Sequence, residues 1–222
     1  MTRTAILVDG GFYRKRAAFL WGKKTAEQRA KELVAYCHAH LHDKDGTETR
    51  QLYRIFYYDC SPIGRRSVFH PFLKRNIDLD KSETYKWTLT FLEELRKCRK
   101  FALRMGTLSA QSYYNLRPEA TKQIFSGKKS IESVTEDDFI FVSTQKGVDM
   151  RIGVDIASLT YKDQVDQIIL IAGDSDFVPA AKLARREGVD FILDPMWADI
   201  RPDLFEHIDG LKSQWKKKEK KA

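Results

Sequence analysis

The sequence predicts an α/β protein built around a parallel β-sheet. Short apolar, β-branched runs alternate with segments of helical periodicity, which is the pattern of successive βαβ units. Residues 167–172 form a nearly continuous aliphatic run of the kind that a parallel sheet buries on both faces. With 222 residues, of which 42% are hydrophobic, the chain can build one substantial core but not two domains of typical size.

The elements follow in chain order from these patterns. Strands are expected at residues 4–8, 50–58, 139–142, 167–172 and 189–193. Helices are expected at residues 25–41, 148–160 and 177–187. Thr25 is a suitable N-cap for the first helix, Gly188 ends the last one, and Asp9-Gly10-Gly11 is a tight turn after the first strand. The alternation predicts right-handed crossovers with helices on both faces of the sheet.

The stretch 61–137 interrupts this alternation. Residues 82–100 form an amphipathic helix with Tyr85, Leu89, Leu92 and Leu95 along one stripe, and residues 101–114 are a strand or hairpin arm. We therefore expect a single domain over residues 1–211 with a basic, partly helical insertion at 61–137. Residues 212–222 are expected to be a basic, disordered tail.

The net charge of +8 is unevenly distributed. Residues 60–130 hold 15 Lys or Arg against 6 Asp or Glu, and residues 212–222 hold 6 Lys against 1 Glu, so the rest of the chain is acidic. An acidic core beside basic segments favours a polyanionic partner that meets a cation-filled site. For the lysine-rich tail alone, ordinary solvated surface is an equally good interpretation.

The sequence also indicates a compartment. Asp9 ends the first apolar run after four residues, and no run approaches the ~18 residues needed to span a bilayer, so we expect a cytoplasmic protein. Cys37, Cys60 and Cys98 are widely spaced and odd in number, which argues against a disulfide framework and a zinc site.

Aspartates follow the predicted strands at positions suited to chemistry. Asp9 and Asp174 come directly after strands, Asp176 follows two residues later, and Asp149 lies in the first turn of a helix. Ligands of open parallel sheets bind beyond the carboxyl ends of the strands, so these side chains are expected to share one crevice. Carboxylate ligands without His or Cys indicate Mg²⁺ or Mn²⁺. Each Asp taken singly could instead be a helix N-cap or a dipole-stabilising residue.

Asp155 is a weaker candidate on the same helix as Asp149. Six residues separate the two, which places them about 120° apart around a regular helix. We therefore assign Asp9, Asp149, Asp174 and Asp176 as the catalytic, metal-binding set and keep Asp155 in a supporting position behind the metal ligands.

Three segments of the sequence resemble a known family. They are Val8-Asp9-Gly10, Lys146-Gly147-Val148-Asp149 with Asp155, and Gly173-Asp174-Ser175-Asp176-Phe177. They are similar to the signature segments of the NYN family of PIN-like nucleases, particularly its LabA-like branch, and the resemblance covers about residues 1–59 and 138–210. It implies a PIN-like, Rossmannoid three-layer fold, an acidic metal site and ribonuclease activity. Many relatives carry an Asn two or three residues after the first Asp, where this chain has Gly11-Phe12-Tyr13.

The resulting hypothesis is a metal-dependent hydrolysis of phosphodiester bonds in RNA, in which a bound ion activates the attacking water. Lys146, Ser143, Thr144 and Ser175 are candidates for contacts with phosphate oxygens. Single-stranded RNA is the expected partner, DNA is an alternative substrate, no membrane partner is expected, and a homodimer is left open. The rival hypothesis is a non-catalytic RNA-binding or complex-forming module with the same fold. A haloacid-dehalogenase-type phosphatase would need an Asp at the position of Gly11.

Overall fold

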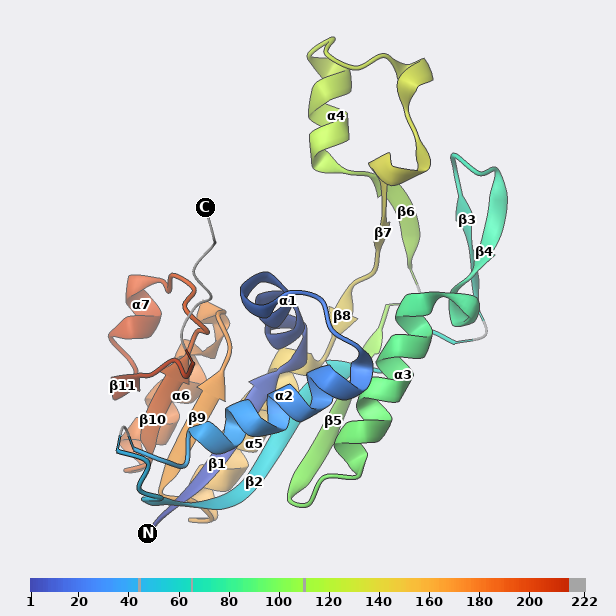
Figure 1. The fold of residues 1–222 in the computed structure, drawn as a ribbon. Coiled ribbons are helices and arrows are strands. Elements are labelled where there is room, and N and C mark those ends of the chain that lie inside the picture. Colours follow the sequence, from blue (N-terminus) through green and yellow to red (C-terminus); the bar gives the residue numbers. More distant parts are fainter. Residues whose placement is uncertain (44, 65, 110, 216–222) are drawn as a thin grey trace.

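The structure, a computed structural model, describes residues 1–43, 45–64, 66–109 and 111–215. Within these residues a seven-stranded sheet forms the centre of the molecule, in the order β11-β10-β9-β1-β2-β5-β8 (Figure 1). Neighbouring strands from β11 to β5 are parallel, and the short β8 runs antiparallel to β5. The strands of this sheet are β1 (Thr2–Asp9), β2 (Arg50–Cys60), β5 (Phe101–Leu108), β8 (Gln145–Lys146), β9 (Gln167–Ile171), β10 (Asp190–Asp194) and β11 (Gly210–Leu211).

Helices cover both faces of the sheet and complete a three-layer α/β fold. One face packs against α1 (Gly10–Trp21), α2 (Ala26–Ala39) and α3 (Glu83–Arg96). The other face packs against α5 (Val148–Tyr161), α6 (Val178–Arg186) and α7 (Pro202–Phe205). These are the layers that the sequence predicts.

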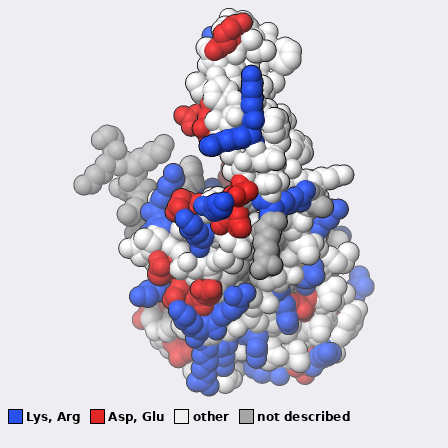
Figure 2. Space-filling view, turned by 90° about the vertical axis from the view of Figure 1, so that its right-hand side faces the viewer, with Lys and Arg blue, Asp and Glu red and all other residues white. Residues whose placement is uncertain are grey.

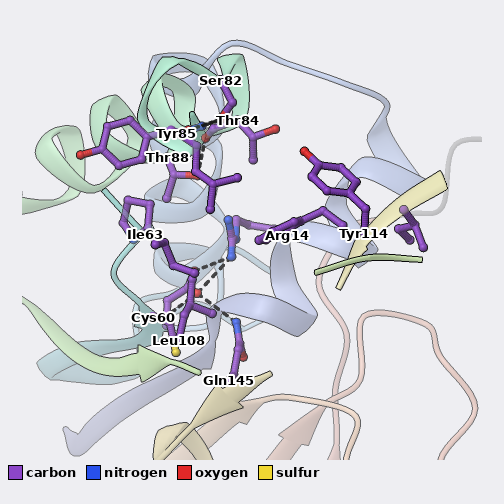
Figure 3. A pocket seen from close by; sticks show the side chains of 15 residues that line it. Arg14, Cys60, Ile63, Ser82, Thr84, Tyr85, Thr88, Leu108, Tyr114 and Gln145 are labelled. Atoms are coloured by element: carbon purple, nitrogen blue, oxygen red, sulfur yellow. Dashed lines mark hydrogen bonds and ion pairs between the residues drawn. The ribbon is translucent and has the colours of Figure 1, made fainter. Parts of the chain in front are cut away.

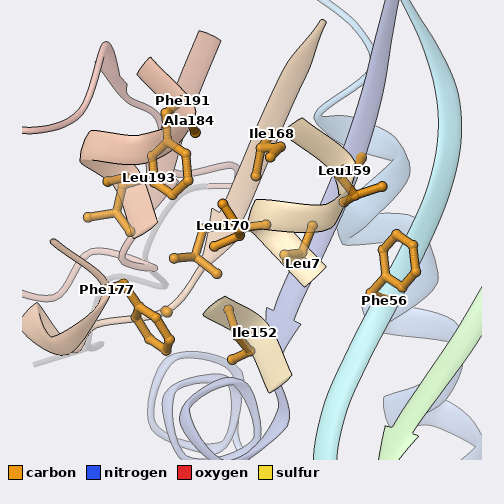
Figure 4. Close-up of a cluster of buried hydrophobic side chains, with 14 of the residues drawn as sticks. Leu7, Phe56, Ile152, Leu159, Ile168, Leu170, Phe177, Ala184, Phe191 and Leu193 are labelled. Carbon is orange, nitrogen blue, oxygen red and sulfur yellow. The ribbon is translucent and has the colours of Figure 1, made fainter. Parts of the chain in front are cut away.

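Strand β1 shows how the sequence builds the two cores. Successive side chains of a strand point to opposite faces, so Ile6 and Val8 pack under α1 and α2 while Ala5 and Leu7 join the core beneath α5 and α6. Figure 4 shows the second core, where Leu7 lies with Ile152 and Leu170. Both cores use β1, which is therefore buried on its two faces, as the continuous apolar run predicts.

Most predicted elements form within a few residues of their expected bounds. Thr25 caps α2 in a capping box with Gln28, and Gly188 has a φ of 84° just after the end of α6. Helix α1 differs from the expectation, because it begins at Gly10 with no intervening turn. The two glycines indicated a turn in the sequence, but the Asp9 side chain accepts a hydrogen bond from the Phe12 amide and starts the helix there.

The stretch expected to be an insertion, 61–137, contributes to the central fold. Helix α3 and strand β5 belong to it, and Phe91, Leu92 and Leu95 of α3 are buried in the core against β1 and β2. The helix itself was predicted, whereas its place in the main helical layer was not. Of the predicted stripe, Leu92 and Leu95 face the sheet, where β5 lies parallel to β2 and needs cover, whereas Leu89 is 36% exposed and Tyr85 belongs to neither core.

The remainder of that stretch projects from the sheet in two pieces (Figure 1). The first is the hairpin of β3 (Ser67–His70) and β4 (Arg75–Asp78), followed by the short helix η1 (Leu79–Lys81). The second, which we call the arm, consists of β6 (Tyr113–Leu116), α4 (Pro118–Phe125), η2 (Ile131–Ser133), η3 (Glu136–Asp138) and β7 (Phe139–Val142). Strand β7 was expected in the parallel sheet but pairs antiparallel with β6. Its apolar run of four residues predicts a strand without specifying the partner.

The expected tail also differs at its start. Ser213 donates a hydrogen bond to Asp194 Oδ1 at 2.7 Å, and the Trp215 ring lies 5.3 Å from that of Trp21 and 5.2 Å from that of Tyr36. These contacts attach residues 213–215 to the sheet and to α1 and α2. The rest of the predicted tail, 216–222, lies outside the described residues.

Among the helices of the described ranges, none combines the length and the hydropathy that a bilayer-spanning segment requires.

Candidate active site

The strand order places a crevice at the carboxyl ends of β1 and β9. From β1 the chain builds the sheet outward through β2 and β5, and then returns to the other side of β1 with β9, β10 and β11. The connections on the two sides of β1 therefore run in opposite directions and leave a crevice between them. Open α/β sheets bind their ligands at such a crevice. Val8 pairs with Ile171 in register. Asp9 and Asp174, which follow these two positions, therefore emerge side by side.

Three of the four predicted aspartates line one open cavity at this point. Asp9 comes from β1, Asp149 from the first turn of α5 and Asp174 from the loop after β9. We call it the carboxylate cavity; its volume is about 560 Å³. Its lining consists of Asp9, Gly11, Phe12, Lys15, Gln145, Asp149, Gly173, Asp174, Ser175 and Arg201.

The pKa values show that these carboxylates interact. Burial, followed by the charges of Asp149 and Asp59, raises the pKa of Asp9 to about 6, although a hydrogen bond from the Phe12 amide opposes the shift. Burial, Asp174 and Asp176 in turn raise the pKa of Asp149. Asp176 is therefore within electrostatic reach of the group even though it does not line the cavity. The four predicted residues form one electrostatic cluster of like charge.

Asp9 and Asp174 also cap helices. Asp9 Oδ1 accepts from the Phe12 amide at 3.1 Å, and Asp174 Oδ1 accepts from the Asp176 amide at 3.1 Å. Capping and ligand binding are compatible, because an ionised carboxylate has about four acceptor sites and each of these hydrogen bonds uses one. The caps fix the two side chains at the mouth of the crevice.

The predicted phosphate-contacting residues separate into two groups. Ser175 lines the carboxylate cavity, whereas Ser143, Thr144 and Lys146 do not. The Ser143 hydroxyl accepts from that of Ser112 at 3.3 Å, and the Thr144 carbonyl accepts from the Ser109 amide. Gln145 lines the carboxylate cavity in place of Lys146, because successive side chains of β8 point to opposite sides of the strand.

Asp155 lies on another side of α5. Its Oδ2 accepts hydrogen bonds from the Tyr58 hydroxyl at 2.8 Å and from Arg104 Nε at 3.0 Å. It does not line the carboxylate cavity, and its contacts join α5 to β2 and β5. The separation of about 120° from Asp149 accounts for this placement.

Sequence reasoning missed a fifth aspartate, Asp59, next to the cavity. Asp59 is the penultimate residue of β2, is 1% exposed, and accepts hydrogen bonds from Tyr57, Gln145 and Arg14. Its ion pair with Arg14, at 2.9 Å, holds the carboxylate in place beside the cavity. The position of Asp59 near the end of the second predicted strand could have indicated a place near Asp9. Its ion pair with Arg14 could not be predicted, because Arg14 lies on α1.

Two cations at the cavity were also missed, Lys15 and Arg201. Both are exposed and line the cavity, yet within the described chain neither forms an ion pair with Asp9, Asp149, Asp174 or Asp176. Arg201 pairs with Asp203 instead, at 3.2 Å. The positive charges therefore do not fill the space among the carboxylates. Lys15 could have been found from its spacing, since it lies one helical turn after Gly11 on α1.

The donor set fits a hard divalent cation, which prefers carboxylate oxygens. Within the described ranges, no three or more His, Cys, Asp or Glu side chains lie close enough together to hold a metal ion. The carboxylates of the cavity are therefore spread apart in this structure. The site is thus an open, repulsive cluster of acids with two cations among its lining residues.

Comparisons with known proteins identify the family of the chain. No curated protein sequence matches the chain. A crystal structure of a protein of unknown function from Vibrio parahaemolyticus RIMD 2210633 matches with a TM-score of 0.47 and 14% sequence identity, covering 95% of this chain and 91% of that one. The NYN domain model matches residues 78–199, more than half of the chain, including Asp149, Asp174 and Asp176. It also spans α3 and β5, which the sequence had suggested to be part of an insertion. The chain therefore belongs to the NYN domain family of PIN-like nucleases.

Proposed function

We propose that the protein is a metal-dependent ribonuclease that hydrolyses phosphodiester bonds at the carboxylate cavity. One observation carries this proposal. Asp9, Asp149 and Asp174 come from three elements far apart in the sequence and line one cavity, where the charge of Asp149 helps to raise the pKa of Asp9 and the charge of Asp174 helps to raise that of Asp149. A cluster of like charge at a strand-order reversal costs folding free energy and is typical of a binding site for an opposite charge.

Asp9, Asp149, Asp174 and Asp176 would hold Mg²⁺ or Mn²⁺. The bound ion would lower the pKa of a water molecule and offset the negative charge on the phosphate. Such binding would offset the burial and the repulsion that together raise the pKa values of Asp9 and Asp149.

The chain's own groups would position the substrate. Lys15 and Arg201 carry exposed positive charges to the cavity, where they can contact phosphate oxygens, and the Ser175 hydroxyl can donate a hydrogen bond to the same group. Gln145 presents an amide beside Asp9, since a Cβ atom on Gly11 would lie 3.4 Å from both Asp9 Oδ1 and Gln145 Oε1. This amide can take the place of the Asn that many relatives carry after the first Asp.

RNA as the substrate is supported by the charge of the molecule. The chain carries a formal net charge of +8. Lys and Arg side chains outnumber Asp and Glu over the body on the face shown in Figure 2. A net positive charge on a molecule that also carries an acidic cavity favours a polyanionic partner together with a cation. Membership of the LabA-like branch and a cytoplasmic location stay predictions.

A cleavage assay with matched variants tests the proposal. Labelled single-stranded RNA is incubated with the protein in Mg²⁺ or Mn²⁺ and in EDTA. Asp174→Asn is expected to lose at least about a hundredfold in rate while folding normally, because the Asn retains the cap acceptor for the Asp176 amide.

The control variant is Asp163→Asn. Asp163 is exposed near Arg3, at the opposite end of β1, and its φ of 49° suits Asn equally well. This variant should cleave at the wild-type rate. RNA binding without cleavage under every condition would contradict the proposal and favour a non-catalytic RNA-binding or complex-forming module.

A further inference from the structure

A second cavity lies next to the carboxylate cavity, and the proposed hydrolysis makes no use of it. Its volume is about 430 Å³, and it lies among α3, the carboxyl ends of β2 and β5, and the strands of the arm (Figure 3). We call it the aromatic cavity, because Tyr85, Tyr114 and Phe141 line it. Its volume is within the range of about 300–1,000 Å³ typical of small-molecule sites.

The walls of the aromatic cavity are flat and apolar. Tyr85 comes from α3, and Tyr114 and Phe141 come from the two strands of the arm. The Tyr114 ring is held in place by the rings of His70, at 4.3 Å, and Phe141, at 5.4 Å. Aromatic rings fixed at a partly open cavity are the surfaces on which unpaired nucleobases stack.

The floor of the cavity is polar and ordered. Arg14 and Gln145 both point at the carboxylate of Asp59, at 3.0 and 3.3 Å (Figure 3). The Arg14 Nη2 bonds to Asp59 and its Nε to the Gly10 carbonyl, whereas its Nη1 has no hydrogen-bond partner among the residues that the structure describes. An ion pair with the buried Asp59 thus holds a hydrogen-bond donor of the half-buried Arg14 at the cavity, and such a donor can bind the edge of a base.

The two cavities are neighbours. Gln145 lines both of them, and the consecutive residues Arg14 and Lys15 of α1 contribute one to each. The negative charge of Asp59, beneath the aromatic cavity, acts on the pKa of Asp9 in the carboxylate cavity. A single strand with one phosphate at the carboxylates would thus pass beside the aromatic walls, which are separated from the carboxylate cavity by the shared residue Gln145.

We propose that the aromatic cavity is a nucleobase subsite, which takes one unstacked base of a single-stranded RNA whose backbone crosses the carboxylate cavity. This inference rests on the proposed function for the identity of its ligand. The subsite would position the scissile phosphate and give cleavage a base preference. Tyr85, Tyr114 and Phe141 would stack on the base, and Arg14 and Gln145 would contact its edge.

The test measures binding in EDTA, so that it does not depend on hydrolysis. Fluorescein-labelled oligoribonucleotides, each with one abasic position, are titrated with the protein and followed by fluorescence anisotropy. One abasic position should weaken binding by about 5- to 100-fold, the effect of losing one stacked base. In Tyr114→Ala the intact oligonucleotide should bind more weakly and this positional effect should disappear, because the two changes remove the same contact.

Two variants provide matched comparisons. Tyr113, the exposed neighbour of Tyr114 on β6, does not line the cavity, so Tyr113→Ala should keep the positional effect. Because Tyr114→Ala also removes packing against His70, a second variant, Ile140→Trp, fills the cavity from a residue that is 40% exposed. It should abolish the effect while its thermal unfolding stays like that of the wild type.

Three results would overturn the subsite: no binding in EDTA, equal effects of every abasic position, or a positional effect that survives both Tyr114→Ala and Ile140→Trp. The accompanying cleavage assay separates this failure from that of the proposed function. Cleavage in Mg²⁺ or Mn²⁺ without base preference would contradict the subsite alone. A positional binding effect without cleavage would contradict the nuclease alone.

Discussion

Asp9 combines two roles that have opposite effects on stability. Its cap stabilises the start of α1, whereas its ionised form is disfavoured by burial and by Asp149, which raises its pKa to about 6. Without a metal, the folded state therefore retains a proton on Asp9 that the unfolded chain releases near the ordinary pKa of 3.8. Stability then falls as the pH rises through this window, because the folded state binds more protons there.

Asp9→Asn should consequently stabilise the metal-free protein at neutral pH. The amide keeps the acceptor for Phe12 and carries no charge, so we expect a gain on the order of 1–3 kcal/mol at about pH 7.5 and almost none near pH 4. Urea unfolding in EDTA at both pH values measures the difference. An equal gain at the two pH values would show that charge is not its cause. Added Mg²⁺ should stabilise the wild type more than the variant.

At the residue scale, the sequence predicted the acids of the site better than their neighbours. Asp9 and Asp174 could be placed because each follows a strand, and parallel strands end at one edge of a sheet. Gln145 and Arg201 could not be placed in this way. Their positions depend on which way β8 turns its side chains and on how the loop before α7 folds back over the crevice.

At the element scale, the start of α1 depends on close packing against β2. A Cβ atom on Gly10 would lie 2.4 Å from the Tyr57 ring and hydroxyl and 2.7 Å from the Tyr58 carbonyl oxygen, whereas one on Gly11 would have its nearest neighbours at 3.4 Å. The close approach of helix and strand therefore requires glycine at the first position and not at the second.

Gly10→Ala and Gly11→Ala form a matched pair that tests this packing. We expect Gly10→Ala to lower the free energy of unfolding by about 1–3 kcal/mol, since a buried Tyr and the β2 backbone would have to move. Gly11→Ala should be neutral or slightly stabilising, because Ala is the better helix former by up to about 1 kcal/mol. Chemical denaturation of both variants provides the measurement, and equal effects would contradict the packing argument.

The elements themselves were predictable where a local pattern decides them. Strand β9 is buried along its whole length, and α5 and α6 lie between strands as the alternation requires. The pairing of β7 with β6 was not predictable, because a run of four apolar residues fits an edge of the sheet and a separate hairpin equally well. For α3, the amphipathic pattern predicted the helix but not which core it faces.

At the scale of the whole molecule, the stretch 61–137 has two parts with different structural roles. Helix α3 and strand β5 are part of the central three-layer unit, whereas the arm contributes no residue to either core. This division follows long-range strand pairing, which the composition of the stretch could not reveal. The basic composition suggested one surface module, but several of its cations lie on α3 and around β5.

Two changes within this stretch should therefore differ in their effect. Replacing residues 117–138 with a two-residue Asn-Gly turn keeps the pair Leu116 and Phe139 and should leave the urea midpoint nearly unchanged. Phe91→Ala should cost about 3–5 kcal/mol, because this ring is fully buried between α3 and the sheet. Urea unfolding followed by circular dichroism compares the two. A large loss of stability on replacing residues 117–138 would show that this part of the arm supports the domain.

The caps of Asp9 and Asp174 have a consequence for how such a protein changes over generations. In both positions Asn supplies the same acceptor to the helix, so a single-base codon change deletes a charge from the crevice without removing a hydrogen bond on which the architecture depends. Loss of activity and loss of shape are thereby uncoupled. If the proposed nuclease activity holds, one such change would remove hydrolysis and leave a chain that still folds.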